Sequence, residues 1–385
     1  MKLARLVPFQ LASPNHPERG AGLRGLRNRC LDLGPLVGTA LAVLALALGA
    51  AALPAQQPRA NQGTALAART AAVAAVGPVA LTVSDMDRSL AFYTGVLDFR
   101  KIADTVVDED SYGRLEGVPG SRMRIVRLRL GEETLQLMAW RRPTGRSAPA
   151  GARSNDRWFQ HVAIIVRDMD SAYAVLQAHG VERVSPAPQR LPDWNRNAGG
   201  IRAFYFHDPD RHPLEILQFP PDKGDPKWRR ASAGGRLFLG IDHTAIVVSN
   251  TETSLRFYRD LLGLRIAGKS LNYGPEQERL NNVPGARLRI TSLRAAAGPG
   301  IEFLEYVTPR DGRPAPADER ANDLVHWQTV VATGDPERLA SRLTTAGVRF
   351  VSPGVVRVAD GALGFDRGFL VRDPDGHVVQ VITPN

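Results

Sequence analysis

The chain has 385 residues, of which 43% are hydrophobic and 23% are charged, and its formal net charge is +10. This composition is ordinary for a folded protein of two to three domains and argues against wholesale disorder, collagen and a polytopic membrane protein. No run of lysine and arginine alternates with aromatic residues, so nucleic-acid binding is not expected.

The N-terminal arm has the pattern of an export signal. A basic region precedes residues 36–55, which carry no charge and end in small residues. This order is typical of a secretory signal peptide, with cleavage expected after Ala55. Twenty uncharged residues would also suffice for an uncleaved membrane anchor. In either case, residues 56–75 are expected to form a linker. We therefore expect an exported protein, periplasmic or extracellular, which contacts the membrane only if this segment is retained.

The single cysteine, Cys30, lies in this arm, so the predicted folded part contains none. Intrachain disulfides, thiolate-rich zinc sites and cysteine nucleophiles are therefore excluded. Any metal must be held by nitrogen and oxygen ligands.

The rest of the chain contains an internal duplication with a constant offset of 165 residues. Residues 79–99 resemble residues 244–264, and the segments beginning at Val118 and His161 recur at the same offset. A register that holds over several landmarks indicates one duplicated unit. We expect two domains, residues 76–219 and 240–385, joined by a linker at residues 220–239.

Each unit divides again into two modules of βαβββ order. In the third module, residues 243–249 alternate with the period of a strand, and apolar residues then recur at helical spacing until Gly263. The fourth module repeats this order, with a helix from Pro336 to about residue 346 and a type I turn at residues 373–376. The predicted fold class is therefore α+β, with modules that start near Val76, Phe159, Gly240 and Leu324.

The motifs of these modules resemble a known superfamily. The run HTAIVVSNTETSLRFYRDLLGL from His243 is similar to the first signature of glyoxalase I, and the DPDG turn is typical of related proteins. From residue 76 onwards, the chain resembles the vicinal oxygen chelate (VOC) superfamily of glyoxalase I, bleomycin-resistance proteins, methylmalonyl-CoA epimerase and extradiol dioxygenases. The resemblance implies two tandem VOC domains, whose paired modules form open cups. It also implies a divalent metal held by side chains from the first and last strands of each module.

Four inward positions of the C-terminal half form the main predicted metal site. His243 and His326 lie at the starts of first strands, and Glu302 and Gln380 lie in last strands. Two imidazoles, a carboxylate and an amide oxygen suit Zn, Mn, Fe, Ni or Co with positions open for water or substrate.

The N-terminal half offers a second, weaker candidate site. Its matching positions are Pro78, Gln136, His161 and Glu215. Pro78 has no side-chain ligand, so this candidate site consists of Gln136, His161 and Glu215.

The predicted chemistry is proton transfer on a small oxygenated substrate. Metal chelation of two neighbouring oxygens would stabilise an oxyanion while a carboxylate moves the proton. Glu302 is the predicted ligand and base. Glu305 is the second candidate, but it would face the other way on a regular strand. A lyase or isomerase is favoured over a dioxygenase, because Gln380 stands where a dioxygenase would be expected to have its carboxylate.

The alternative is a non-catalytic protein that sequesters a small ligand, as bleomycin-resistance proteins do. Its binding groove could be lined by Trp140, Trp194, Tyr273 and Trp327, although aromatic residues more often pack in a core. Bound metal distinguishes the two hypotheses, because an enzyme of this kind requires the metal.

Overall fold

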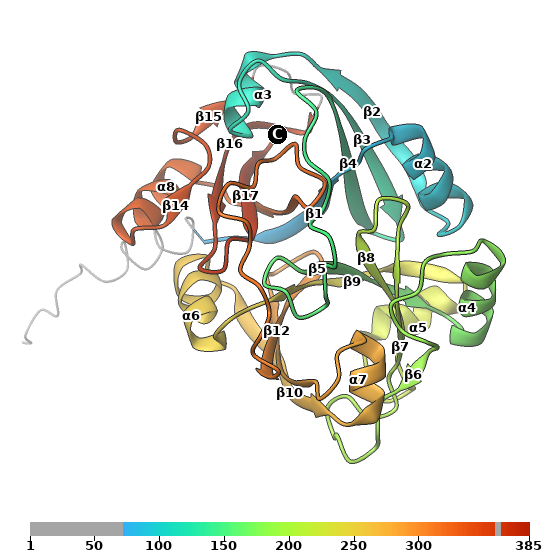
Figure 1. The fold of residues 1–385 in the computed structure, drawn as a ribbon. Helices are drawn as coiled ribbons and strands as arrows, with labels where there is room; N and C mark the ends of the chain where they lie inside the picture. The colour runs from blue at the N-terminus through green and yellow to red at the C-terminus, as the bar shows by residue number, and fades with distance from the viewer. Residues whose placement is uncertain (1–71, 359–362) are drawn as a thin grey trace, which may run out of the picture. The chain divides into compact units, whose positions relative to one another are not determined.

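The computed structural model describes residues 72–358 and 363–385. The predicted signal segment and most of the linker after it lie outside the described residues. The described residues form two curled β-sheets with helices packed against them (Figure 1). Among these residues, no helix is long and apolar enough to cross a membrane.

The N-terminal half contains two modules of the predicted order. Asp85 and Asp168 accept hydrogen bonds from backbone N–H groups at the first turns of α2 and α4, so each helix begins soon after the first strand. Module 1 consists of β1 (Ala75–Thr82), α2 (Met86–Gly95), β2 (Arg100–Val107), α3 (Asp110–Leu115), β3 (Arg122–Leu130) and β4 (Glu133–Arg142). Module 2 consists of β5 (Gln160–Val166), α4 (Met169–Ala178), β6 (Gln189–Arg190), β7 (Arg202–His207) and β8 (Pro213–Gln218).

The C-terminal half repeats this plan, and Gly263 and Gly347 follow its helices with positive φ angles, as expected for helix ends. Module 3 consists of β9 (Phe238–Val247), α6 (Thr251–Leu255), a π-helical continuation (Arg256–Leu261), β10 (Arg265–Tyr273), α7 (Pro275–Asn281), β11 (Arg287–Arg294) and β12 (Gly300–Thr308). Module 4 consists of β13 (Trp327–Ala332), α8 (Pro336–Thr345), β14 (Arg349–Phe350), β15 (Val356–Arg357), β16 (Phe365–Arg372) and β17 (Val378–Pro384).

The segment between the halves is more ordered than the predicted linker. It contains α5 (Pro226–Ser232), which begins after Asp225, and β9 already starts at Phe238. Helix α5 is held in place because its Trp228 side chain is buried among apolar side chains of β5, β8 and β9. The connection is therefore part of the folded structure.

Each sheet takes one module from each half of the chain. In one sheet the strand order is β10-β11-β12-β9-β5-β8-β7-β6, and modules 2 and 3 meet where β5 and β9 pair antiparallel. In the other sheet the order is β14-β16-β17-β13-β1-β4-β3-β2, and modules 1 and 4 meet at β1 and β13. We call their concave sides the β5–β9 cup and the β1–β13 cup. The expectation that the two modules of one half form a cup is corrected, because the first strands pair across the halves.

The two modules of one half are joined by a hydrophobic core instead of by strand pairing. In the N-terminal half, Val79 of β1 and Val162 of β5 belong to one buried cluster with the inner faces of α2 and α4. In the C-terminal half, Ile246 of β9 and Val331 of β13 belong to the equivalent cluster. Each half thus supplies most of one core, to which a few residues of the other half contribute, whereas each cup requires both halves.

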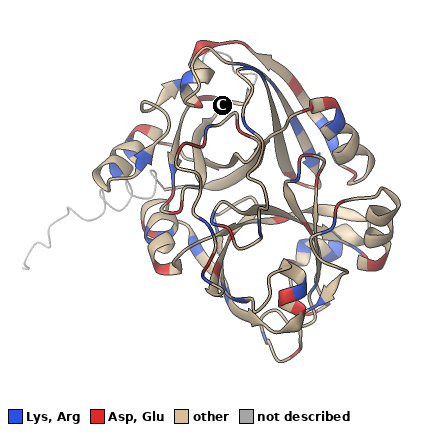
Figure 2. Cartoon of the chain, viewed as in Figure 1, with Lys and Arg blue, Asp and Glu red and all other residues tan. Residues whose placement is uncertain are grey.

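Charged residues of both signs are interspersed over the helices and strands (Figure 2). Two of the resulting ion pairs fasten the loops that cross between the halves. Arg146 Nη2 lies 2.7 Å from Asp323 Oδ2, and Arg313 Nη2 lies 2.6 Å from Asp156 Oδ2. Both aspartates are buried, so these pairs are less screened by solvent than ordinary surface pairs.

Candidate metal centre

Four side chains that could bind a metal converge in the β5–β9 cup. His161 lies on β5, Glu215 on β8, His243 on β9 and Glu302 on β12. The Nε2 atom of His161 lies 3.2 Å from Glu215 Oε2. The Nε2 atom of His243 lies 3.8 Å from the same oxygen and 3.5 Å from Glu302 Oε2. Each of modules 2 and 3 therefore supplies one imidazole and one carboxylate.

The strand pairing explains why these residues meet. Within a module the first and last strands are parallel neighbours, so Glu215 pairs with Ala163 and Glu302 pairs with Ala245. Each alanine lies two residues after a histidine, and residues two apart on a strand face the same side. The antiparallel pairing of β5 with β9, which sets His161 opposite Ala245, then brings both pairs together.

The four residues fit a divalent cation. Nitrogen and oxygen atoms bound at about 2.1 Å to one cation lie about 3 to 3.5 Å apart, close to the separations observed here. The Nε2 atoms of His161 and His243 are buried and have no hydrogen-bond partner. The ligand atoms of His161, Glu215 and His243 all lie within 4.8 Å of one another. Two carboxylates also balance the charge of a divalent cation, and this ligand set suits Zn, Mn, Fe, Ni or Co.

The carboxylates of the cup change the protonation of His243. Burial alone lowers the pKa of an imidazole, but the negative charges of Glu302, Asp242 and Glu215 outweigh this effect and raise the pKa of His243 to about 9. The cup therefore has a negative potential that favours a positive charge at this position.

The structure divides the main predicted site between the two cups. His243 and Glu302 lie with His161 and Glu215, which the sequence analysis placed in the second candidate site. His326 lies directly before β13 and Gln380 lies on β17, both in the other sheet, as does Gln136 on β4. The grouping of His243, Glu302, His326 and Gln380 around one cation is therefore corrected, because modules 3 and 4 contribute to different sheets.

The β1–β13 cup has a different set of side chains at the equivalent positions. The strand register sets Gln136 opposite Arg127, as it sets Glu302 opposite Ser292 in the other cup. Arg127 Nε donates a hydrogen bond to Gln136 Oε1 at 3.2 Å, and Arg127 Nη2 donates to the Leu363 carbonyl. A guanidinium beside a neutral amide repels a cation, so the Gln136 position of this cup lacks the electrostatic attraction that Glu302 provides in the β5–β9 cup.

His326 is also engaged by other partners. Its Nδ1 atom contacts the Glu319 carboxylate, and its Nε2 atom lies 2.9 Å from Nε2 of Gln328. The Gln328 amide also donates to Glu116. The residue equivalent to Gln328 in the β5–β9 cup is Ala163, whose small side chain blocks neither histidine there.

Three of the candidate ligands, Glu215, His243 and Glu302, line a cavity of about 430 Å³ in the β5–β9 cup. The Ser292 hydroxyl donates to Glu302 Oε1 at 2.5 Å, which leaves Oε2 directed toward His243. The Glu302 side chain is 18% exposed, compared with 5% for Glu215, so Glu302 is the more accessible carboxylate. Other lining residues provide both apolar and polar surface, among them Tyr205, Leu217, Leu280, Leu304, Asn197, Ser270 and Asn272.

Glu305, the second candidate base, faces away from the cup. Its carboxylate accepts hydrogen bonds from the backbone and hydroxyl of Thr251 at the start of α6, and from Arg289. These contacts hold the pKa of Glu305 below its usual value even though burial opposes the shift. The prediction from strand alternation, that Glu305 faces away from Glu302, is therefore confirmed.

The four aromatic residues proposed for a sequestering groove do not line one surface. Trp194 and Tyr273 are exposed, and their ring centroids lie 4.3 Å apart. Trp140 and Trp327 are buried and belong to two different hydrophobic clusters.

Asp242 and Ser292, which contact the candidate ligands, are not among the site residues predicted from the sequence. Asp242 Oδ2 lies 3.0 Å from His243 Nδ1. The available signal for Asp242 was an acidic residue directly before a histidine at a strand start. The distribution of ligands was also a signal, because modules 2 and 3 are the two modules that contain both a histidine and a glutamate at these positions.

Comparison with known families agrees with this fold and site. The model of the Glyoxalase/Bleomycin resistance protein/Dioxygenase superfamily matches residues 75–216 and 240–381. The chain therefore belongs to this superfamily and contains two tandem copies of its domain, which confirms the resemblance noted in the sequence.

Individual relatives include two enzymes. A 2-epi-5-epi-valiolone epimerase from an Actinomyces species is 34% identical over 152 residues, which are 38% of this chain and 80% of the epimerase. Lactoylglutathione lyase from Schizosaccharomyces pombe is 27% identical over 198 residues, which are 49% of this chain and 59% of the lyase.

Solved structures show the same fold at low sequence identity. Glyoxalase I from Zea mays has a TM-score of 0.53 and 15% identity, over 80% of this chain and 92% of that protein. A putative dioxygenase from Bacillus subtilis has a TM-score of 0.50 and 14% identity, over 81% and 86% of the two chains.

Proposed function

We propose that the protein is a divalent-metal-dependent enzyme that transfers a proton on a small substrate with two neighbouring oxygens. The observation that supports this proposal is the convergence of His161, Glu215, His243 and Glu302 in the β5–β9 cup, where all but His161 line one cavity. A metal bound by these residues would polarise a substrate oxygen and stabilise the negative charge that develops there.

Within this proposal Glu302 moves the proton. Its carboxylate is the more accessible of the two in the cavity, and Ser292 fixes one of its oxygens. A carboxylate held in this way can take a proton from a carbon beside a carbonyl group and return it. Glu215, which lies between the two histidines, acts as a ligand only.

Among reactions of this type we favour epimerisation. The supporting observation is that the valiolone epimerase is matched over 80% of its length, whereas the lactoylglutathione lyase is matched over 59% of its length. An epimerase removes and returns a proton at one carbon, which is the step that a single accessible carboxylate can perform. We therefore choose 2-epi-5-epi-valiolone as the first substrate to test.

Metal binding tests the site. Full-length protein should bind one Co²⁺ per chain, and His161→Ala or His243→Ala should lower the affinity by at least tenfold, because each removes a ligand. His326→Ala is the matched control, since it removes a buried histidine of the other cup. Equal affinity in the wild type and both ligand variants would contradict the assignment. A wild-type protein that binds 2-epi-5-epi-valiolone without any metal would favour a sequestering function.

Solvent deuterium exchange tests the role of Glu302. At saturating Co²⁺ the wild type should incorporate deuterium from D2O into 2-epi-5-epi-valiolone, detected by mass spectrometry. Glu302→Gln should reduce this rate by about 100-fold or more, because an amide cannot accept the proton. Glu305→Gln, which alters a buried carboxylate on the opposite face, should retain the wild-type rate. Exchange at the wild-type rate in Glu302→Gln would exclude Glu302 as the base.

We also propose that the enzyme is exported, on the basis of residues 36–55. Fractionation of cells that express the full-length protein tests this proposal. Intact full-length protein in the soluble cytoplasm would contradict it.

A further inference from the structure

One of the two histidines in the β5–β9 cup has a carboxylate behind it. Asp242 Oδ2 lies 3.0 Å from Nδ1 of His243, on the side of the ring opposite to the proposed metal position. The Nδ1 atom of His161 has no such partner among the described residues. The two imidazoles are therefore held in place by different means.

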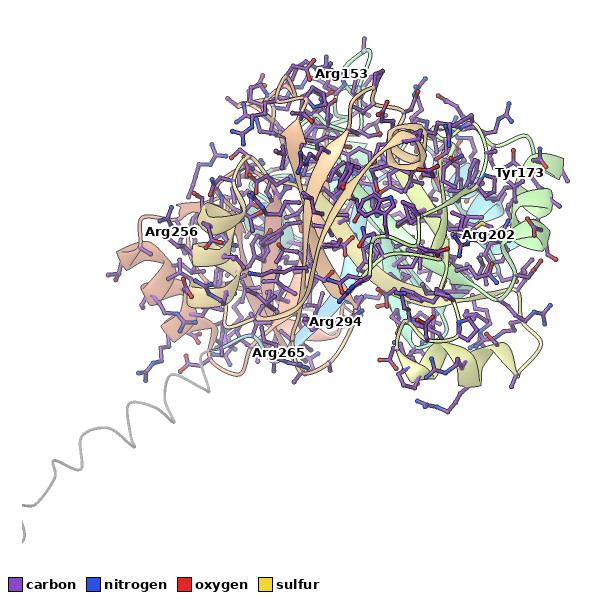
Figure 3. The ribbon with its side chains drawn as sticks, turned by 90° about the horizontal axis from the view of Figure 1, so that it is seen from below. Arg153, Tyr173, Arg202, Arg256, Arg265 and Arg294 are labelled. Atoms are coloured by element: carbon purple, nitrogen blue, oxygen red, sulfur yellow. The ribbon has the colours of Figure 1, made fainter. Side chains whose placement is uncertain are left out.

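The second oxygen of Asp242 is fixed by two further donors. The Trp228 indole Nε1 donates to Oδ1 at 3.2 Å, and Arg294 Nη2 donates to the same oxygen at 2.9 Å. Trp228 comes from α5 and Arg294 from β11, where Figure 3 labels it. Both oxygens of a buried carboxylate thus serve as acceptors, which restricts its position from two sides.

Helix α5 is itself tied to the strand that carries His243. Lys227 contacts the Glu133 carboxylate, and the other oxygen of Glu133 accepts a hydrogen bond from the backbone N–H of Ile241 at 3.1 Å. Ile241 directly precedes Asp242. The connection between the two halves of the chain is therefore linked to the site through both Trp228 and Lys227.

The internal duplication provides a comparison within the same chain. The residues equivalent to Asp242 and His243 in the β1–β13 cup are Gly77 and Pro78. The acid and the histidine are therefore absent together from the cup that lacks the ligand set. Asp242 thus occurs together with the candidate ligand His243. The equivalent sheet forms without an aspartate at this position, so the fold does not require one.

We propose that Asp242 is a positioning residue for the metal ligand His243, and that Trp228 of α5 holds Asp242 in the required orientation. The inference rests on the proposed function, since it assumes that His243 binds a metal. An acceptor at Nδ1 keeps the proton on that nitrogen and leaves the Nε2 lone pair directed into the cup. A charged acceptor also makes Nε2 a stronger donor to the metal.

Substitution at Asp242 separates this role from simple packing. In Asp242→Asn the side chain keeps its shape but has only one acceptor oxygen. Either His243 or the Trp228–Arg294 pair must then face an N–H group. We expect Co²⁺ affinity, measured by competition with a chromophoric chelator, to fall about 10-fold in Asp242→Asn and up to about 100-fold in Asp242→Ala. Trp228→Phe, which removes the N–H donor and leaves a smaller aromatic ring, should weaken binding less.

The control is a buried aspartate–histidine pair that does not line the cavity. Asp208 Oδ2 lies 2.9 Å from His212 Nδ1, close to the separation of Asp242 from His243. Asp208→Asn should lower thermal stability but leave Co²⁺ affinity within twofold of the wild type. The visible absorption spectrum of bound Co²⁺ should change in the Asp242 variants and in Trp228→Phe, and remain the same in Asp208→Asn.

The outcomes distinguish this inference from the proposed function. A wild type that binds no Co²⁺ overturns both. A wild type that binds Co²⁺, together with Asp242→Asn and Trp228→Phe of unchanged affinity and spectrum, overturns the positioning role and leaves the metal site intact. Weaker binding in Asp242→Asn with restored affinity in Asp242→Glu would support the inference.

Discussion

A few side chains decide which of the two cups can hold a cation. At positions that the duplication makes equivalent, the β5–β9 cup has Ala163 and Ser292, whereas the β1–β13 cup has Gln328 and Arg127. In the β1–β13 cup, Gln328 hydrogen-bonds to His326, and Arg127 hydrogen-bonds to the amide of Gln136. The same backbone plan therefore gives a cavity with ligands in one case and a hydrogen-bonded polar core in the other.

Glu116 in the β1–β13 cup predicts a specific pH dependence of stability. Burial raises the pKa of Glu116 from 4.5 to about 7, although contacts with His326, Gln328 and Tyr112 oppose the shift. The folded protein therefore keeps a proton that the unfolded chain releases between about pH 4.5 and 7. Stability from this group is fully present below pH 4.5 and is lost as the pH rises to about 7.

Glu116→Gln should remove this loss, because the amide stays neutral at every pH. At pH 8 its free energy of unfolding should exceed that of the wild type by about 1–3 kcal/mol, measured by urea denaturation, while the difference at pH 4.5 should be small. Glu305→Gln should instead be destabilising at pH 8. Burial raises the pKa of Glu305, but its hydrogen bonds have the larger effect, so the net pKa is lowered and the charged carboxylate stabilises the folded protein. Identical pH profiles of Glu116→Gln and wild type would contradict this prediction.

At the scale of elements, the order of strands within a module places a histidine beside a glutamate. The first and last strands of modules 2 and 3 are parallel neighbours, so their inward residues share one face. Two such pairs meet only because β5 and β9 also pair. The loops that follow β4 and β12 hold the halves together through Arg146–Asp323 and Arg313–Asp156.

A glycine in one of these loops is predicted to be essential for their close approach. A Cβ atom at Gly312 would lie 1.9 Å from the carbonyl oxygen of Asn155. Gly312→Ala should therefore lower the free energy of unfolding by about 1–3 kcal/mol, as measured by denaturant titration, because the backbone of one loop must move. Gly95→Ala is the control, since no atom lies within 4 Å of a Cβ atom there. Equal stability of the two variants would refute the prediction.

At the scale of the whole molecule, the proposed active site belongs to neither half alone. His161 and Glu215 come from the N-terminal half, and His243 and Glu302 come from the C-terminal half. Each half nevertheless supplies most of one large hydrophobic core. In the described part of the chain, both sheets are shared between the halves.

A chain cut between residues 223 and 224 tests this arrangement. Neither fragment alone should bind Co²⁺ with the affinity of the full-length protein, because each contains only one histidine and one glutamate of the set. Co-expression of the two fragments should restore binding, measured by the same chelator competition. Full affinity in the C-terminal fragment alone would contradict a site that is shared between the halves.

The sequence by itself determined the module plan, the duplication and the identity of the residue types that could bind a metal. These features follow from local periodicity and from a repeat with a constant offset, which do not depend on distant contacts. Gly263 and Gly347, for example, end their helices as expected because a helix end depends on nearby residues only. The inward positions of His243 and Glu302 follow from strand alternation in the same way.

Only the tertiary structure decided which modules share a cup. The antiparallel pairing of β5 with β9 joins strands whose partners lie about 80 residues apart, and no local pattern encodes which first strand becomes the neighbour of another. The assignment of His161 and Glu215 to the same cup as His243 depends entirely on that pairing. The role of Trp228 likewise required the packing of α5, because a residue in a connecting segment has no sequence signal that links it to a buried carboxylate.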